Sequence, residues 1–575
     1  MSSPAMADCL AKFKVLRAAG GQETGGMDNH GNPVSIVNAT AMSYALCIQT
    51  CGTGPIFRAW SIFSQRFSTW LLPFLALVCQ LPFGANNRVS SQVEYSGEII
   101  HIQSWYQLDN IVSMLLHVGS PTLGAYSVIL TLLNTYWIRR RFSHISYPNA
   151  HNAMRILNAL QQAALKVNTE DALLASLVVL PENNLWWSEL IVWLDMNYAH
   201  TWSFANVASI GWVVVAFSLT VIDVFKDVTN NSTPPLNSNG LAVAFAWLWL
   251  LPIVTSWLQT GPRSDRSSLH RAVAHANELA YMATEIGAPV PAGILFNQRA
   301  ICIARRHNHV GADEHRTAPV YNYARIFCWT AAVEAVYSAF NEANLRAENC
   351  TPVNPNLVWL HDRDGKIKDE NRRGSLKHVA FYVGGDPGDE RRWVPGSVIF
   401  RILVSSAFAL LLTWGTISGA ILLQFFTPTI GLSCRSGSYL LYACVSTLVW
   451  VLLILSSFLS SVPWHTHSSR SRTSPLAGRA AVLLRRSGKI LASMNSTWIV
   501  LTCLFQFTGI YDSCWCTSSH LYLGARAYSV LILTPADIAA LWYPVIGATL
   551  LASGVVIAFI TFINVLREPE IPSPT

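Results

Sequence analysis

Two apolar runs, residues 402–426 and residues 439–462, constrain this chain more than any other feature. Each is longer than twenty residues, and neither contains a charged side chain. A helix needs about 20 residues to cross the ~30 Å hydrocarbon layer of a membrane, so each run is long enough to span it. Because the link between the two runs is short, they predict a pair of antiparallel membrane helices.

The composition supports a chain that is largely surrounded by lipid. Charged residues make up 12% of the 575 residues, hydrophobic residues make up 51%, and tryptophan alone occurs 21 times. A typical soluble protein has about 25% charged residues. Since so few charges cannot cover a water-exposed surface of this size, a large part of the surface must face lipid.

Eight segments reach or approach spanning length, which predicts an all-α membrane protein, a polytopic bundle of about eight transmembrane helices. The expected helices are residues 67–85, 111–138, 204–225, 240–258, 402–426, 439–462, 498–511 and 538–566. The expected organisation is an N-terminal cytosolic region (1–66), helices one to four with a cytosolic loop at 139–203 (67–258), a mostly helical cytosolic insertion (259–396), helices five to eight (397–566) and a C-terminal tail (567–575).

The distribution of basic residues orients this bundle. If the segments between eight helices alternate sides, 34 of the 39 lysine and arginine residues lie on one side and four on the other. Without the long segment 259–396, which weighs little in the positive-inside rule, the split is still 17 to four. We therefore expect both termini to be cytosolic, in a membrane of the secretory pathway or the plasma membrane. Because the basic residues follow the topology, no nucleic-acid partner is expected.

Glycosylation and disulfide signals fall on the opposite, non-cytosolic side. Asn230 and Asn231 each open an Asn-x-Ser/Thr sequon, and Cys434, Cys514 and Cys516 lie in two short loops. Disulfides are permitted in that compartment. We expect Cys434 to pair with Cys514 or with Cys516, and the alternative is three free thiols.

Polar residues inside the expected membrane segments are sparse. His117 stands next to a helix-breaking Gly-Ser-Pro sequence at residues 119–121, and Gln424 and Gln506 are uncharged amides within apolar helices. Intramembrane polar groups are candidates for a transport path. The alternative for His117 is a buried histidine that hydrogen-bonds to a neighbouring helix.

Other features allow simple structural interpretations. The tryptophan-rich stretch 186–194 predicts a helix that lies either at the lipid headgroups or against the protein's own loops. The Gly-x-x-x-Gly pair at Gly415 and Gly419 favours close packing of helices. The histidines at 307–315 lack the spacing of a metal site. No metal, cofactor or catalytic set is expected, so the sequence favours a protein that is not an enzyme without deciding the question.

Several stretches together resemble a family of multi-pass membrane proteins of filamentous and mushroom-forming fungi. They cover mainly residues 319–530 and are Pro-Val-Tyr-Asn-Tyr-Ala-Arg at 319–325, Trp-Gly at 414–415, the Phe-Thr-Pro-Thr stretch that runs through Cys434 to Tyr439, and Tyr-Asp-x-Cys-x-Cys at 511–516. The resemblance implies the membrane class and a recurring lumenal cysteine set of Cys434, Cys514 and Cys516. It implies no activity, because the family has none that is established.

Two functions remain open from the sequence. The first is a non-catalytic membrane scaffold or receptor-like protein, with the lipid bilayer around it and a protein partner bound to cytosolic segment 259–396. The second is a transporter or channel-like protein with a polar cavity near His117, Gln424 and Gln506. The scarcity of intramembrane charge favours the first.

Overall fold

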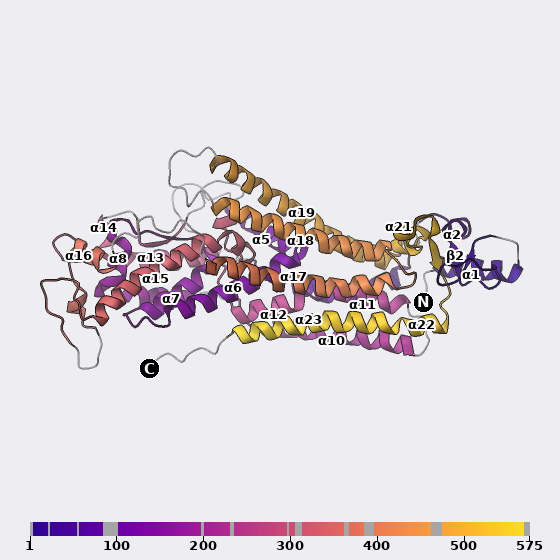
Figure 1. Cartoon of the computed structure of the whole chain (residues 1–575), viewed down its shortest axis with the longest axis horizontal. Helices are drawn as coiled ribbons and strands as arrows, with labels where there is room; N and C mark the ends of the chain where they lie inside the picture. The colour runs from indigo at the N-terminus through magenta and orange to yellow at the C-terminus, as the bar shows by residue number, and fades with distance from the viewer. Residues whose placement is uncertain are drawn as a thin grey trace.

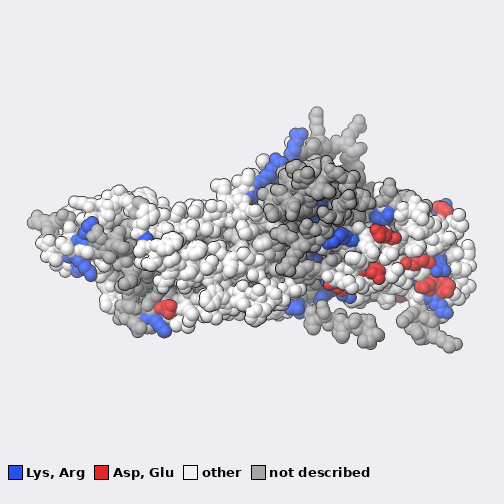
Figure 2. All heavy atoms as spheres, turned by 180° about the vertical axis from the view of Figure 1, so that it is seen from behind, with Lys and Arg blue, Asp and Glu red and all other residues white. Residues whose placement is uncertain are grey.

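The computed structural model describes residues 4–20, 24–54, 57–83, 102–196, 200–229, 235–295, 298–304, 313–361, 367–384, 396–461 and 474–567. It is an elongated, mostly helical molecule in which a long helix bundle separates two smaller lobes (Figure 1). On the face seen in Figure 2, charged side chains gather toward the two ends and an uncharged band lies between them. Such a band is what a membrane-spanning surface requires.

Among the described residues, six helices or helix pairs are long and apolar enough to cross a membrane. Five of them follow directly from the apolar runs of the sequence, because in lipid each helix satisfies its own backbone hydrogen bonds. The helix expected at 498–511 instead begins at Ser474 and ends at Thr508, so it includes much of the expected loop. The six are α10 (Phe204–Thr229), α11 (Pro235–Trp247) continued by α12 (Leu250–Thr260), α17 (Gly396–Phe425), α18 (Cys434–Ser461), α19 (Ser474–Thr508) and α22 (Pro535–Ala540) continued by α23 (Trp542–Leu566).

The helices expected at 67–85 and at 111–138, the second with a helix-breaking sequence at residues 119–121, are each divided in the structure. The first is divided into α3 (Trp60–Arg66), a π-helical turn (Phe67–Leu71) and α4 (Leu72–Val78). The second is divided into α5 (Ile102–Gly119) and α6 (Pro121–Phe142), which meet at a bend of 102°. The structure therefore does not confirm eight continuous spans.

The α5–α6 pair begins and ends near the same lobe. Asp109 of α5 forms an ion pair with Arg316 at 2.9 Å, and Arg141 at the end of α6 forms one with Glu334 at 3.1 Å. Both partners belong to the segment 313–361, outside the membrane helices. The pair thus dips into the bundle and returns, whereas a single crossing is expected from its composition.

Small residues allow a close helix contact between α17 and α23. A Cβ atom added at Gly419 would lie 3.2 Å from both the Ala548 carbonyl oxygen and the Ala552 Cβ. At Gly415 it would lie 2.6 Å from the Val555 side chain. The glycines therefore let the two helices approach closely, as small residues do in membrane bundles.

The helical lobe, at the end of the bundle where α6, α12 and α23 terminate, is built around its own apolar core. Trp186 and Trp187 are fully buried in it, so the tryptophan-rich helix packs on the protein itself. Two two-stranded sheets, β3–β6 and β4–β5, complete the lobe. The elements are α7 (Ala150–Ala159), β3 (Leu165–Val167), α8 (Leu173–Val179), α9 (Asn184–Met196), α13 (Arg266–Glu278), β4 (Tyr281–Met282), β5 (Val290–Pro291), α14 (Ala292–Leu295), β6 (Ile301–Ile303), α15 (Ile326–Glu348) and α16 (Leu376–Tyr382).

Buried polar contacts fasten this lobe to the bundle. Asp313 is fully buried and accepts hydrogen bonds from the Tyr323 hydroxyl and from Lys489 of α19. Arg401 of α17 donates to Asn134 of α6 and, at 3.1 Å, to Thr330 of α15. Because buried charges require such partners, these contacts fix how the lobe sits on the membrane helices.

The disulfide lobe occupies the other end of the bundle and contains the start of the chain. A three-stranded antiparallel sheet in the order β1-β2-β7 joins residues near the N-terminus to residues that precede the last helix. Its elements are α1 (Pro4–Ala19), β1 (Gly26–Met27), β2 (Ala41–Ser43), α2 (Tyr44–Cys51), α20 (Cys514–Thr517), α21 (His520–Leu523) and β7 (Tyr528–Val530).

The first helix, α1, and the last residues of α23 lie at opposite ends of the bundle (Figure 1). Residues 1–66 are expected beside segment 259–396, yet the described part of this region lies in or next to the disulfide lobe. Arg567, which follows α23, lines a cavity together with residues of the helical lobe, so α23 ends at that end of the bundle. The difference follows from the α5–α6 pair, which contacts the same segment, 313–361, near its start and at its end and so does not run the length of the bundle.

Candidate functional site

The break between α5 and α6 gathers polar side chains in the middle of the bundle. Ser120 donates to the Ser446 carbonyl oxygen at 2.8 Å and accepts from the Leu123 backbone N–H at 3.3 Å, so it caps α6. The Thr122 hydroxyl lies 3.0 Å from the Ser446 hydroxyl and donates to Thr413 at 3.1 Å. Since Ser446 lies near the middle of α18, the start of α6 is held halfway along the bundle.

The carbonyl groups that end α5 also have partners. The Tyr442 hydroxyl donates to the Val118 carbonyl oxygen at 2.6 Å, and the Asn495 amide donates to the Gly119 carbonyl oxygen at 2.7 Å. Non-helical backbone at membrane depth is tolerated only where it is satisfied in this way or faces water. Here side chains of α18 and α19 supply the bonds, so the break is a closed, hydrogen-bonded joint.

His117 is fully buried one turn before this joint. Its Nδ1 lies 2.9 Å from the Ser113 carbonyl oxygen, which can only accept, so Nδ1 carries the proton. Its Nε2 and the Ser113 hydroxyl have no hydrogen-bond partner among the described residues. His117 therefore bonds within its own helix, and one acceptor atom remains unpaired inside the bundle.

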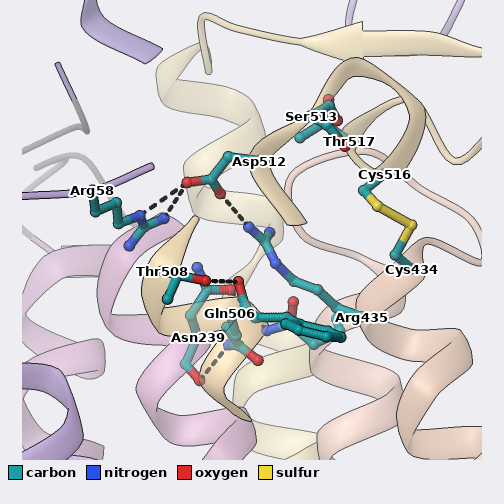
Figure 3. Close-up of polar contacts among 12 residues, drawn as sticks. Arg58, Asn239, Cys434, Arg435, Gln506, Thr508, Asp512, Ser513, Cys516 and Thr517 are labelled. Carbon is teal, nitrogen blue, oxygen red and sulfur yellow. Dashed lines mark hydrogen bonds and ion pairs between the residues drawn. A yellow bond between two sulfur atoms is a disulfide. The ribbon is translucent and has the colours of Figure 1, made fainter. Parts of the chain in front are cut away.

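Gln424 and Gln506 come together near the disulfide end, on either side of Asn239. Gln424 donates to the Asn239 side-chain oxygen at 3.1 Å, and Gln506 donates to its backbone oxygen at 2.9 Å. Tyr439 donates to the Gln506 side-chain oxygen at 2.8 Å. Figure 3 shows Asn239 beside Gln506 in this cluster. His117 is not part of it, so the three candidates do not form one cavity.

A buried ion cluster lies just beyond this amide cluster (Figure 3). Asp512 accepts from Arg58 at 3.0 and 2.5 Å and from Arg435 at 2.5 Å. All three side chains are less than 10% exposed. One carboxylate thus serves two guanidinium groups, which join the N-terminal region to the loops that flank α18 and α19.

Three disulfides cross-link the disulfide lobe, which lies next to this ion cluster. Cys434 pairs with Cys516, which is one of the two partners expected from the sequence. The remaining two bridges, Cys9–Cys51 and Cys47–Cys514, involve cysteines that the expected cytosolic placement of residues 1–66 left unpaired. The presence of three cysteines in the first 51 residues is the signal that could have revealed them. The Asn230 and Asn231 sequons lie outside the described residues.

Three of these sulfur atoms offer no metal site. The Sγ atoms of Cys47, Cys51 and Cys514 lie within 4.8 Å of one another. All three are disulfide-bonded, and a cysteine binds a metal as a thiolate. Their proximity therefore reflects two neighbouring bridges.

Two cavities stand out in the part of the chain that the structure describes. A largely apolar groove of about 720 Å³ runs between α4 and α10, beside Trp70 and Trp212. A polar cavity of about 840 Å³ lies where α6, α12 and α23 meet the helical lobe. It is called the interfacial cavity below. Neither is lined by His117, Gln424 or Gln506.

No family model, curated protein sequence or solved structure matches the chain. The resemblance to fungal membrane proteins therefore stays a prediction. The long apolar helices and the uncharged band nonetheless define a class: this chain is a mostly helical, polytopic membrane protein.

Proposed function

We propose that this protein is a receptor-like membrane scaffold, in which a closed bundle connects a disulfide lobe on one face of the membrane to a helical lobe on the other. The observation that supports this most is that the polar groups at two places inside the bundle bond to other groups of the protein, except for Gln424 Oε1 and His117 Nε2, which have no partner among the described residues. Gln424 and Gln506 bond to Asn239, and the backbone of the α5–α6 break bonds to Tyr442 and Asn495. A transport path would need such groups to face water.

We also propose seven crossings, with the N-terminal region outside the cytosol and the C-terminal tail inside. The interrupted segment 60–80 runs along the bundle, since Arg58 bonds to the end of α19 and the Gln80 backbone bonds to His200 beside the helical lobe. The α5–α6 pair adds no crossing. Disulfides form in oxidising compartments, and the basic run 139–141 at the other end fits the cytosolic face.

The helical lobe offers a surface on which a cytosolic protein would bind. Leu357, Val358 and Leu360 form an exposed apolar loop, and the Val358 side chain is 84% exposed. Asn371 holds this loop by hydrogen bonds of 2.9 and 2.8 Å to the backbone of Leu360. A fixed apolar loop on a polar lobe is typical of a protein-binding site.

A transporter is the second candidate, because one observation favours it. Broken helices that meet near the middle of a membrane form substrate sites in many transporters. Here the α5–α6 break lies at that level, and the unpaired Nε2 of His117 is next to it. The two functions differ in one respect: a transporter needs water to reach the centre of the bundle.

Cys503 allows a direct test of this difference. It is a free, fully buried cysteine on α19, between Asn495 at the break and Gln506 in the amide cluster. We would keep Cys503 and replace the other five free cysteines by serine, then treat the reconstituted protein with a charged methanethiosulfonate reagent. A scaffold leaves Cys503 unmodified in the mass spectrum.

The matched control keeps Cys350, an exposed cysteine of the helical lobe, in place of Cys503. It must react completely for the comparison to hold. Modification of Cys503 at a rate near that of Cys350 would show a water-filled path. That result would contradict the scaffold and favour the transporter.

A further inference from the structure

The interfacial cavity combines an apolar inner wall with a basic rim. Its inner wall contains apolar residues from the ends of the bundle helices: Leu132, Leu258, Ile563 and Leu566. The same helices continue into its rim, where Arg139 lies in the last turn of α6 and Arg567 follows α23. Arg155 and Arg263 line it from the side of the helical lobe. The cavity thus spans the boundary between the uncharged band and the charged lobe.

The rim has an excess of positive charge. Asp195 is the single carboxylate among the described lining residues, and it pairs with Arg155 at 3.0 Å and with Arg263 at 2.7 Å. Arg139 and Arg567 line the same cavity and have no ion pair among the described residues. Four guanidinium groups therefore face one carboxylate.

The positive charges of the rim also affect the pKa of a neighbouring histidine. The pKa of His151 is lowered by burial and, in addition, by the positive charges of Arg155 and Arg139. A positive potential beside a cavity raises the local concentration of anions. The charge count and the histidine therefore agree on a site for a negatively charged group.

The polar groups of the inner wall are already occupied. Gln161 donates to Thr135 at 3.2 Å, and Gln162 donates to Thr131 at 3.2 Å. These two amides bond within the protein, and the guanidinium groups of the rim are the charged donors that a ligand would meet. Guanidinium groups bind phosphate oxygens in a bidentate manner.

The surroundings of the cavity favour a ligand with a hydrocarbon chain. Trp202 lines the cavity and is half exposed, and Phe204 at the start of α10 is 90% exposed. Val565 near the end of α23 is exposed as well. Tryptophan side chains are enriched at the level of the lipid headgroups. Exposed apolar side chains next to such a tryptophan face the acyl chains. A ligand that enters here would come from the membrane.

We propose that the interfacial cavity binds the phosphate-bearing headgroup of an acidic membrane lipid, with Arg139 and Arg567 as its principal donors. A volume of about 840 Å³ suits a headgroup with the first part of its acyl chains. Basic pockets between membrane helices on the cytosolic side bind such headgroups. The inference is independent of the receptor role, since either a scaffold or a transporter could hold a lipid here.

The test measures binding of dioctanoyl phosphatidic acid to the full-length protein in detergent, by native mass spectrometry and thermal shift. Dioctanoyl phosphatidylcholine is the neutral comparison. We expect phosphatidic acid to bind at least about tenfold more tightly than phosphatidylcholine. The double variant Arg139→Gln/Arg567→Gln should lose about tenfold or more of that affinity, because each charge-assisted contact is strong.

The matched control is Arg140→Gln, next to Arg139 on the same helix end but not a lining residue of the cavity. It should bind as the natural protein does, and all variants should melt at the same temperature without lipid. Equal binding of the two lipids would overturn the proposal, and so would full binding by the double variant. Displacement of phosphatidic acid by millimolar inorganic phosphate would also overturn it, because the site would then take a soluble anion.

Discussion

Arg58 and Asp512, 454 positions apart in the chain, are joined by two hydrogen bonds of 3.0 and 2.5 Å inside the protein. Arg435 binds the other oxygen of the same carboxylate at 2.5 Å. Asp512 therefore connects the segment before the first bundle helix to the start of α18 and the end of α19. Cys514 of the Cys47–Cys514 bridge lies two residues after Asp512, and Cys434 of the Cys434–Cys516 bridge precedes Arg435. Together they make one joint of three distant parts of the chain.

Replacing Asp512 should destabilise the contact between these three parts of the chain. The change Asp512→Asn leaves two buried guanidinium groups without a counter-charge, and breaking a buried pair in this way costs about 3–5 kcal/mol. We expect a clear fall in the melting temperature of the detergent-solubilised protein. The matched control is Asp195→Asn, since Asp195 also pairs with two arginines but is 45% exposed. The Asp195→Asn variant should lose about 0–1 kcal/mol of stability. Equal losses in the two variants would contradict the role of burial.

Gly119 is the point at which α5 touches α19. A Cβ atom at this position would overlap the backbone carbonyl group of Ala492, and backbone cannot move aside as a side chain can. The change Gly119→Ala should therefore cost about 1–3 kcal/mol or more. Gly211→Ala on α10 is the control, because nothing lies within 4 Å of its Cβ. That variant should be as stable as the natural protein or slightly more stable. A stable Gly119→Ala protein would show that the α5–α6 pair does not pack as described.

Sequence patterns predict the membrane helices well and their connections less well. Residues 402–425 and 439–461 of the two apolar runs lie within α17 and α18, because an uncharged run of that length has few alternatives to a helix in lipid. The Gly-Ser-Pro break after His117 is also visible in the sequence. The sequence does not show whether the chain crosses the membrane or turns back at this break, since both kinds of helix have the same composition.

The uncertain direction of the chain after this break explains why residues 1–66 and their cysteines are expected on the wrong side of the bundle. If α5–α6 is counted as a crossing, residues 1–66 fall on the cytosolic side, and Cys9, Cys47 and Cys51 are expected to be reduced. The structure instead pairs all three. The polar candidates show a similar limit: Gln424 and Gln506 meet through Asn239, a residue whose position only helix packing determines. Arginines 139, 155, 263 and 567 likewise converge only in the fold.

The proposed topology predicts that the two ends of the chain lie on opposite faces of the membrane. An epitope at the N-terminus should be accessible to antibody in intact, right-side-out vesicles, and an epitope at the C-terminus only after permeabilisation. The reason is the odd number of crossings that remains when α5–α6 returns to its own side. A third epitope, inserted after Val358 in the exposed loop of the helical lobe, should behave as the C-terminal one does. If both terminal epitopes were accessible together, the seven-crossing topology would be wrong.

His200 should make the stability of the protein depend on pH. Burial lowers the pKa of its imidazole, although the bond to the Gln80 backbone opposes this, and its Nε2 has no partner among the described residues. The unfolded chain therefore binds a proton at His200 at a higher pH than the folded protein does. Stability is then fully present above the ordinary pKa of about 6.5 and falls as the pH drops below it.

We expect the melting temperature to fall between pH 7.5 and pH 5, and to fall less in the variant His200→Gln. Glutamine keeps a polar side chain at this position but cannot take up the proton, so it removes only the His200 part of the pH dependence. His361→Gln, at an exposed histidine of the helical lobe, is the control and should leave the slope unchanged. If His200→Gln and the natural protein lost stability in parallel, protonation of His200 would not be coupled to unfolding, and the contact between segment 60–80 and the start of α10 would be less buried than described.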